Sequence, residues 1–203
     1  MKGVNNFELV RKLLKFESKD QFYFIELIQR KKDDESLSVN NRLVKYYMIR
    51  SLEHFDKVKD EIIQISHATN SRVYINLNRR SYKKITVELL KLCAQYISDE
   101  NYLGVNSVIS SVCGQYRTET EPTWIIDVNE VIRPNSNYVK EMINYVENEC
   151  EPVGNKFKTI IPTINGVHII VSPFNVQRFK VKYPNIDVHK NNPTLLYYNE
   201  TRN

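Results

Sequence analysis

Apolar and polar positions follow two clear periods along the 203-residue chain. Alternation rich in β-branched and aromatic residues is typical of strands, whereas apolar residues at helical spacing indicate amphipathic helices. The predicted strands cover residues 22–29, 42–50, 72–78, 123–128, 159–161, 167–171 and 194–198. The predicted helices cover residues 6–16, 51–67, 82–98, 137–149 and 174–183. These elements predict an α+β fold with a mixed or antiparallel sheet and flanking helices.

A polar, turn-like stretch around residues 118–122 divides this pattern. Residues 1–121 hold three predicted strands and two long helices, and residues 122–203 hold the remaining strands and two helices. The length fits one domain, so we expect the two parts to form one compact unit.

The stretch 158–173 contains the strongest turn signal, because Asn165-Gly166 separates two β-branched runs. His168 follows the turn directly and begins the second run. Asn165 and His168 are therefore held beside a tight turn, where a ligand can approach. A partly buried structural histidine is the alternative interpretation.

A second candidate site lies in the apolar run 123–128, which carries the carboxylate of Asp127. Burying a carboxylate is costly unless it meets a cation. Period-2 alternation places Asp127 and Asn129 on one face of the strand, and paired oxygen ligands suit Mg²⁺ or Mn²⁺. Asp187 repeats the apolar–Asp step. Alternatively, Asp127 ends a strand or pairs with a lysine.

Arg79 and Arg80 stand between the strand 72–78 and the helix 82–98. Two guanidiniums beside a helix N-terminus form a candidate phosphate site. Two solvated arginines at the end of an element are an equally good explanation.

Composition narrows the function classes. Neither GxGxxG nor GxxxxGK[ST] occurs, which argues against P-loop and dinucleotide-binding proteins. The net charge of +5 mildly favours the binding of polyanions such as nucleic acid. The 3 cysteines are far apart in the sequence, which indicates a reducing compartment. We find no signal peptide or membrane-spanning run, and expect a cytoplasmic protein without a membrane partner.

Three short motifs occur in a fixed order: Asp127 with Asn129 in an apolar strand, Gly166-Val167-His168, and Ile186-Asp187. This order resembles the RRM-like catalytic core of the archaeo-eukaryotic primase superfamily over about residues 123–198. The chain also looks like small proteins encoded by phages and mobile elements of gut bacteria, through its Asn165–His168 turn and its segment 189–194.

The resemblance implies a primase- or polymerase-like nucleotidyltransferase that uses a nucleoside triphosphate and a single-stranded nucleic-acid template. It implies that Asp127, Asn129 and Asp187 hold Mg²⁺ or Mn²⁺ and that His168 contacts the triphosphate. Lys190, with Arg79, Arg80 and Asn165, would add nucleotide contacts. Phosphoryl transfer needs mainly positioning and charge neutralisation, which such a set supplies.

Asn129 departs from the family motif, in which a second acid occupies this position. An asparagine gives a neutral carbonyl ligand and no charge, so metal binding is weakened. Two alternatives therefore remain: a non-catalytic protein that binds nucleic acid or a nucleotide on the same fold, and a metal-dependent nuclease.

Overall fold

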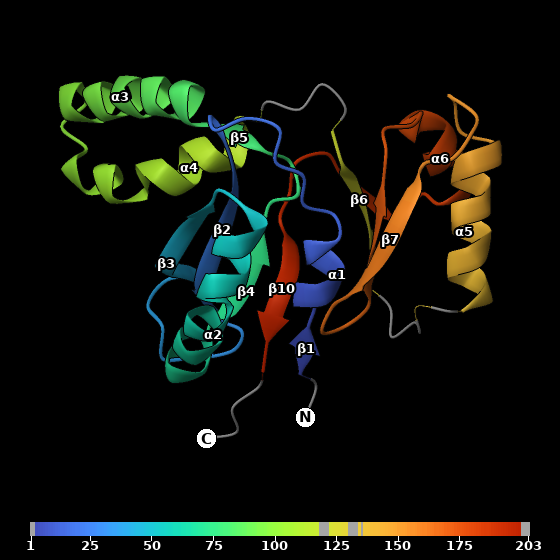
Figure 1. The fold of residues 1–203 in the computed structure, drawn as a ribbon, viewed down its shortest axis with the longest axis horizontal. Helices are drawn as coiled ribbons and strands as arrows, with labels where there is room; N and C mark the ends of the chain where they lie inside the picture. Colours follow the sequence, from blue (N-terminus) through green and yellow to red (C-terminus); the bar gives the residue numbers. More distant parts are fainter. Residues whose placement is uncertain (1–2, 118–121, 130–133, 135, 200–203) are drawn as a thin grey trace.

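The computed structural model describes residues 3–117, 122–129, 134 and 136–199. This part of the chain is an α+β protein with two antiparallel sheets and six α-helices. The sheets lie beside each other, and helix α1 (Phe7–Arg11) lies near their junction (Figure 1). No helix within the described ranges is long and apolar enough to cross a membrane.

The larger sheet has the strand order β1-β10-β4-β2-β3, and β5 pairs with β2 at one end. Its two longest strands, β2 and β3, correspond to the predicted strands 22–29 and 42–50 and form an antiparallel hairpin. The strands span Val4–Asn5 (β1), Gln21–Arg30 (β2), Asn41–Ile49 (β3), Arg72–Ile75 (β4), Arg80–Ser81 (β5) and Thr194–Tyr198 (β10).

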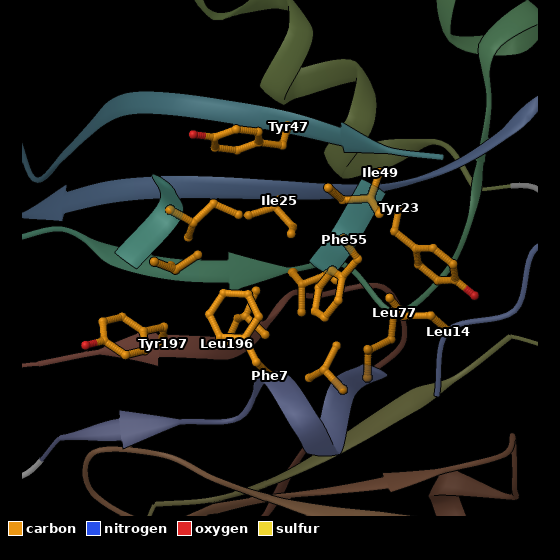
Figure 2. Packing of buried hydrophobic residues seen from close by; sticks show 14 of the residues in the cluster. Phe7, Leu14, Tyr23, Ile25, Tyr47, Ile49, Phe55, Leu77, Leu196 and Tyr197 are labelled. Atoms are coloured by element: carbon orange, nitrogen blue, oxygen red, sulfur yellow. The ribbon is translucent and has the colours of Figure 1, made fainter. Parts of the chain in front are cut away.

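The alternation along β2 explains why helices cover both faces of this sheet. Tyr23, Ile25 and Leu27 point into a core shared with α1 and α2 (Leu52–Thr69), which Figure 2 shows from close by. Phe22 and Phe24 point the other way, into a core with α3 (Tyr82–Ser98) and α4 (Val108–Gln115). Each fully buried side chain of this size contributes about 1.5–3 kcal/mol.

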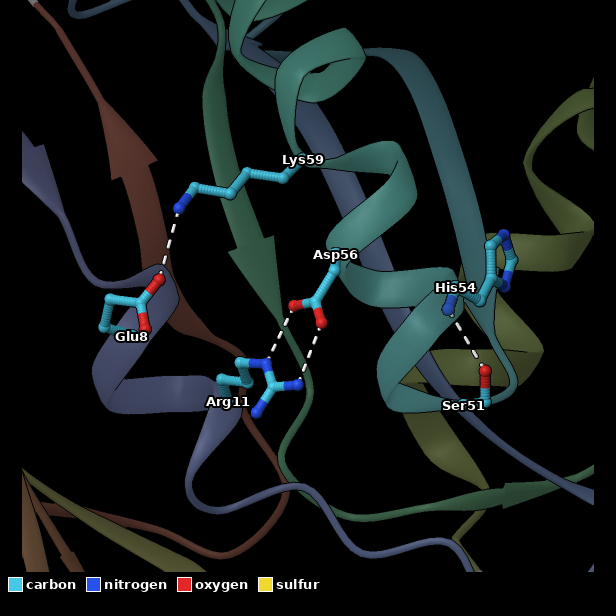
Figure 3. A network of polar contacts seen from close by, with 6 residues as sticks. All are labelled: Glu8, Arg11, Ser51, His54, Asp56 and Lys59. Carbon is cyan, nitrogen blue, oxygen red and sulfur yellow. Dashed lines mark hydrogen bonds and ion pairs between the residues drawn. The ribbon is translucent and has the colours of Figure 1, made fainter.

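Polar contacts fix α1 against α2 on the first face (Figure 3). The Arg11 guanidinium donates two hydrogen bonds to the Asp56 carboxylate, at 2.8 and 2.9 Å. Helix α2 begins where the Ser51 hydroxyl accepts a hydrogen bond from the backbone N–H of His54, as expected for an N-cap.

The smaller sheet has the order β7-β8-β6-β9. With its helices it forms a βαββαβ unit whose two halves interleave, the split β-α-β arrangement. Helices α5 and α6 cover the face turned away from the larger sheet (Figure 1). The elements span Trp124–Val128 (β6), Asn137–Asn148 (α5), Phe157–Pro162 (β7), Val167–Val171 (β8), Val176–Lys182 (α6) and Asp187–His189 (β9).

The opposite face of the smaller sheet joins the main core. Ile125, Ile161 and Ile170 pack in the same cluster as α1 and the larger sheet. A single apolar cluster thus includes residues of both sheets and holds the two sheets together.

Two details differ from the sequence-based expectation, and a third was not predicted from the sequence. The strand expected over 72–78 ends at Ile75, because the Asn78 side chain bonds the backbone of Thr123 and bends the chain away. The region after α3, whose conformation the sequence leaves open, forms a 3-10 helix (Tyr102–Ser107) and then α4. The last strand, β10, pairs with β1 and β4 of the larger sheet, although it follows the smaller one in the chain. The expected boundary at residue 121 lies outside the described residues.

Candidate functional site

Three residues far apart in the sequence lie in one row across three neighbouring strands. Asp127 of β6 is the register partner of His168 on β8 and of Asp187 on β9. Opposite residues of an antiparallel pair direct their side chains to the same face. We call His168, Asp127 and Asp187 the cross-strand row. The side chains of Asp127 and His168 point toward the larger sheet and line the space between the sheets.

Two imidazoles approach the Asp127 carboxylate. His168 Nε2 lies 3.5 Å from Asp127 Oδ1, and His189 Nε2 lies 3.6 Å from Asp127 Oδ2. Both distances allow an ion pair but exceed ordinary hydrogen-bond length. The Asp127 and His168 side chains are only 18% and 15% exposed. The Asp127 carboxylate and the two imidazoles are therefore close together and largely shielded from solvent, but they form no hydrogen bonds of ordinary length with one another.

Asp127 is held in its charged form. Burial pushes the pKa of its carboxyl upward, but the neighbouring His168 ring, aided by Asn129 and His189, brings the pKa below its usual range. Its Oδ1 atom is nonetheless buried and has no hydrogen bond of normal geometry within the described part of the chain. An ionised carboxylate oxygen that is buried without a hydrogen bond is suited to bind a cation or to accept a hydrogen bond from a ligand.

The ring of His168 is oriented by Thr194, a fully buried residue of β10. The Thr194 hydroxyl lies 2.8 Å from His168 Nδ1. An ionised carboxylate only accepts hydrogen bonds, so Nε2, which faces Asp127, is assigned the proton. In the neutral ring, Nδ1 then accepts the hydrogen bond that the Thr194 hydroxyl donates.

Asp187 shares the register of Asp127 but not its surroundings. Its carboxylate is 68% exposed and lies 3.5 Å from the ammonium of Lys180 on α6. Asn129 is exposed just beyond β6. The described residues contain no group of three or more histidine, cysteine or acidic side chains arranged to hold a metal ion.

The side-chain oxygens of Asp127, Asn129 and Asp187 do not fit a site in which protein ligands surround two metal ions. Asp127 and Asn129 do fit one hydrated Mg²⁺ or Mn²⁺, since Mg²⁺ is commonly held by one or two carboxylates with substrate phosphates completing its shell. The unbonded Oδ1 of Asp127 is the structural observation that favours this partial site.

A cavity of about 520 Å³ opens between the sheets at this place. Asp127, Asn129, Asn165, His168 and His189 line it from the smaller sheet. Its opposite wall belongs to β2, β4 and the loop after β2, and carries three cations. The cations are Arg30, Lys32 and Arg72. Small-molecule sites commonly occupy 300–1,000 Å³, so one nucleotide is of suitable size.

Arg79 and Arg80 lie elsewhere, and neither lines this cavity. Arg80 is fully buried and donates hydrogen bonds to the backbone carbonyls of Cys113 and Asn78. Arg79 pairs with Glu17 at 2.9 Å. Both guanidiniums thus have structural partners, which argues against the phosphate site considered from the sequence.

Lys190 also lies outside the cavity lining. Its ammonium sits 5.0 Å from the centre of the Trp124 ring, and its carbonyl accepts hydrogen bonds from Asn78 and Arg117. The structure therefore gives Lys190 a packing role beside β6.

Sequence reasoning assigned no site role to His189 or Thr194, or to the three cations Arg30, Lys32 and Arg72. His189 lies on a strand of only three residues, too short for alternation to reveal a face. Lys32 belongs to a charged segment that has the composition of an ordinary solvated loop. The signal that could have found His189 is its spacing of two residues from Asp187, which places both on one strand face.

Comparisons of the chain with protein-family models, curated proteins and solved structures find no match. The fold and the cavity therefore define an α+β protein with a polar site between two antiparallel sheets, and function must be argued from that site.

Proposed function

We propose that this protein is a primase-like nucleotidyltransferase whose active site is the cavity between the two sheets. The observation that carries the proposal is the cross-strand row, because three motif residues separated in sequence occupy one register line of β8, β6 and β9. The split β-α-β arrangement of the smaller sheet supports the resemblance to the RRM-like primase core.

In this proposal a nucleoside triphosphate enters the cavity with its phosphates near Asp127. Asp127 and Asn129 would hold Mg²⁺ or Mn²⁺, which would supply positive charge beside the transferred phosphoryl group. His168 donates a hydrogen bond from Nε2 to a phosphate oxygen. Its ring is already oriented by Thr194, so little ordering is needed when the nucleotide binds.

The Asn165–Gly166 turn borders the same cavity. Asn165 offers an amide to the nucleotide there, whereas a single-stranded template would lie along the outer opening. Nucleoside triphosphates are cytoplasmic compounds, so the cytoplasm remains the expected compartment.

Nucleotide incorporation on single-stranded DNA and RNA templates, with Mg²⁺ or Mn²⁺, tests the proposal. Asp127→Ala and His168→Ala should each abolish incorporation while the protein stays folded by circular dichroism. Asp60→Asn is the matched control, because Asp60 is an exposed acid on α2. The proposal fails if the wild-type protein incorporates no nucleotide on any template, or if Asp127→Ala remains active.

A second candidate is a non-catalytic nucleotide-binding protein on the same fold. The ion pair between Asp187 and Lys180 favours it, because it engages the third motif carboxylate outside the cavity. Calorimetry separates the two candidates: nucleotide binding that depends on Asp127, without any incorporation, would support the non-catalytic protein.

A further inference from the structure

We propose that Arg30, Lys32 and Arg72 form a phosphate-binding subsite on the larger-sheet wall, and that it receives the phosphate chain of a nucleoside triphosphate. This inference rests on the proposed function for the identity of the ligand but not for the existence of the anion site. We refer to these three residues as the basic wall.

The basic wall is built by the sheet itself. Arg72 of β4 is the register partner of Ile28 on β2, and Arg30 lies two residues further along β2 on the same face. Lys32 follows in the loop after β2. All three side chains line the cavity opposite Asp127 and His168. The two sheets thus present cations and an acid–histidine set across one space.

Two of these cations are fixed by neighbours. The Arg72 guanidinium donates two hydrogen bonds to the Asp33 carboxylate, at 2.6 and 2.5 Å, and lies over the Tyr198 ring. Arg30 donates a hydrogen bond to the Tyr74 hydroxyl at 3.2 Å. Such partners hold the guanidiniums in place before a ligand arrives, which lowers the entropy cost of binding.

Lys32 is the cation left for the ligand. Its ammonium has no hydrogen-bond or ion-pair partner among the residues that the structure describes. Partial burial and the nearby charges of Arg72 and Arg30 lower the pKa of Lys32, with Asp33 opposing them. Three cations beside the single carboxylate of Asp33 leave a positive excess, and a polyphosphate is the ligand that such an excess favours.

The experiment uses inorganic tripolyphosphate as the probe, titrated into the full chain by calorimetry in metal-free buffer. Without metal, Asp127 repels the probe and cannot account for its binding. Lys32→Met keeps the aliphatic stem and removes the charge, and Lys32 is an exposed loop residue, so the variant is expected to fold. One lost charge-assisted hydrogen bond should weaken binding about tenfold.

Two controls accompany this variant. Lys32→Arg keeps the charge and should bind within about threefold of the wild type, since a guanidinium also serves phosphate. Lys57→Ala removes an equal charge from the exposed face of α2, away from the cavity, and should leave binding unchanged. Equal binding by the wild type and Lys32→Met, or equal losses in Lys32→Met and Lys57→Ala, would overturn the subsite.

Competition identifies the source of the phosphate. ATP should displace tripolyphosphate and adenosine should not. If only a 5′-phosphorylated oligonucleotide displaces the probe, the assignment to a nucleoside triphosphate is overturned. If the wild-type protein binds tripolyphosphate in a Lys32-dependent way but incorporates no nucleotide, the proposed function alone is refuted. If it incorporates nucleotides but its tripolyphosphate binding does not depend on Lys32, the subsite alone is refuted.

Discussion

The hydroxyl of Thr194 lies 2.8 Å from Nδ1 of His168, so a strand of the larger sheet orients a side chain of the smaller one. Thr194 belongs to β10 and His168 to β8. The contact crosses the boundary between the sheets beside Asp127. The state of the candidate site is therefore set by residues from both sheets.

Thr194→Val should remove this orientation with little change in shape. The loss of one buried hydrogen bond should cost about 1 kcal/mol of stability. Nucleotide incorporation should fall more steeply than stability predicts, because the His168 ring is then free to change tautomer. ¹⁵N NMR of the His168 ring reports the tautomer directly, and a change there distinguishes positioning from general destabilisation. Thr194→Ser keeps the hydroxyl, so it should preserve the wild-type tautomer; a shift in this variant would contradict the role of the hydrogen bond.

Removing divalent metal should stop incorporation without unfolding the protein. The described residues offer no group of three or more histidine, cysteine or acidic side chains for a metal, so the metal is expected to depend on the phosphates of the substrate. Thermal melting with EDTA should match melting with Mg²⁺ in the absence of nucleotide, since a ligand that binds weakly stabilises little. A rise of the melting temperature of several degrees on adding Mg²⁺ alone would indicate a preformed metal site.

Asp33→Ala should strongly destabilise the protein, because Asp33 is the ion-pair partner of Arg72. Asp33 and Arg72 form an ion pair at 2.5 Å whose side chains are 8% and 10% exposed. Removing one partner leaves the other charge buried and unpaired, at a cost of about 3 kcal/mol. Urea denaturation measures this cost. The double variant Asp33→Ala/Arg72→Met should recover part of it, and no recovery would show that the pair does not act as a unit.

Glu26 should make the stability depend on pH. Burial raises the pKa of this carboxyl, although the nearby Ser110 hydroxyl and the charge of Arg80 oppose the shift. A raised folded-state pKa means that the folded protein holds the proton more tightly. The contribution of Glu26 to the free energy of unfolding is therefore fully present below the pKa of about 4.3 that Glu26 has in the unfolded chain. This contribution is lost as the pH rises through the pKa of Glu26 in the folded protein.

Glu26→Gln removes this titration and provides the comparison. The free energy of unfolding of the wild type minus that of Glu26→Gln should decrease as pH rises from about 4, and then become constant. Urea denaturation at a series of pH values measures the difference. A difference that grows with pH would mean that Glu26 is stabilised as a carboxylate in the folded protein.

The sequence predicted the hairpin of β7 and β8 well, because it depends on local alternation and on a tight turn. The approach of Asp127 to His168 was implied only by the order of the motifs, since α5 and β7 separate β6 from β8 in the chain. Asn165-Gly166 joins β7 to β8, and that hairpin brings His168 beside β6. The position of Asp187 on the same row was implied only by motif order, and its contact with Lys180 depends on how α6 packs.

Long-range packing explains what the sequence could not show. The sequence alone does not show that Arg79 contacts Glu17 and that Arg80 contacts Cys113, because these partners are distant in the chain. The basic wall arises because β4 lies beside β2, which places Arg72 near Arg30. Pairing between strands about 45 residues apart leaves no local periodic signal in a single sequence.

The path of the chain from β9 to β10 has a mechanical consequence. Strand β9 closes the smaller sheet, and β10 is inserted in the larger one between β1 and β4. The larger sheet is therefore incomplete without a strand from the other half of the chain, in the manner of donor-strand complementation. If the chain were divided between α4 and β6, the N-terminal fragment would lack β10, and the C-terminal fragment would carry β10 without its neighbours β1 and β4. Reassociation of the two fragments would complete the larger sheet and rebuild the cavity between the sheets.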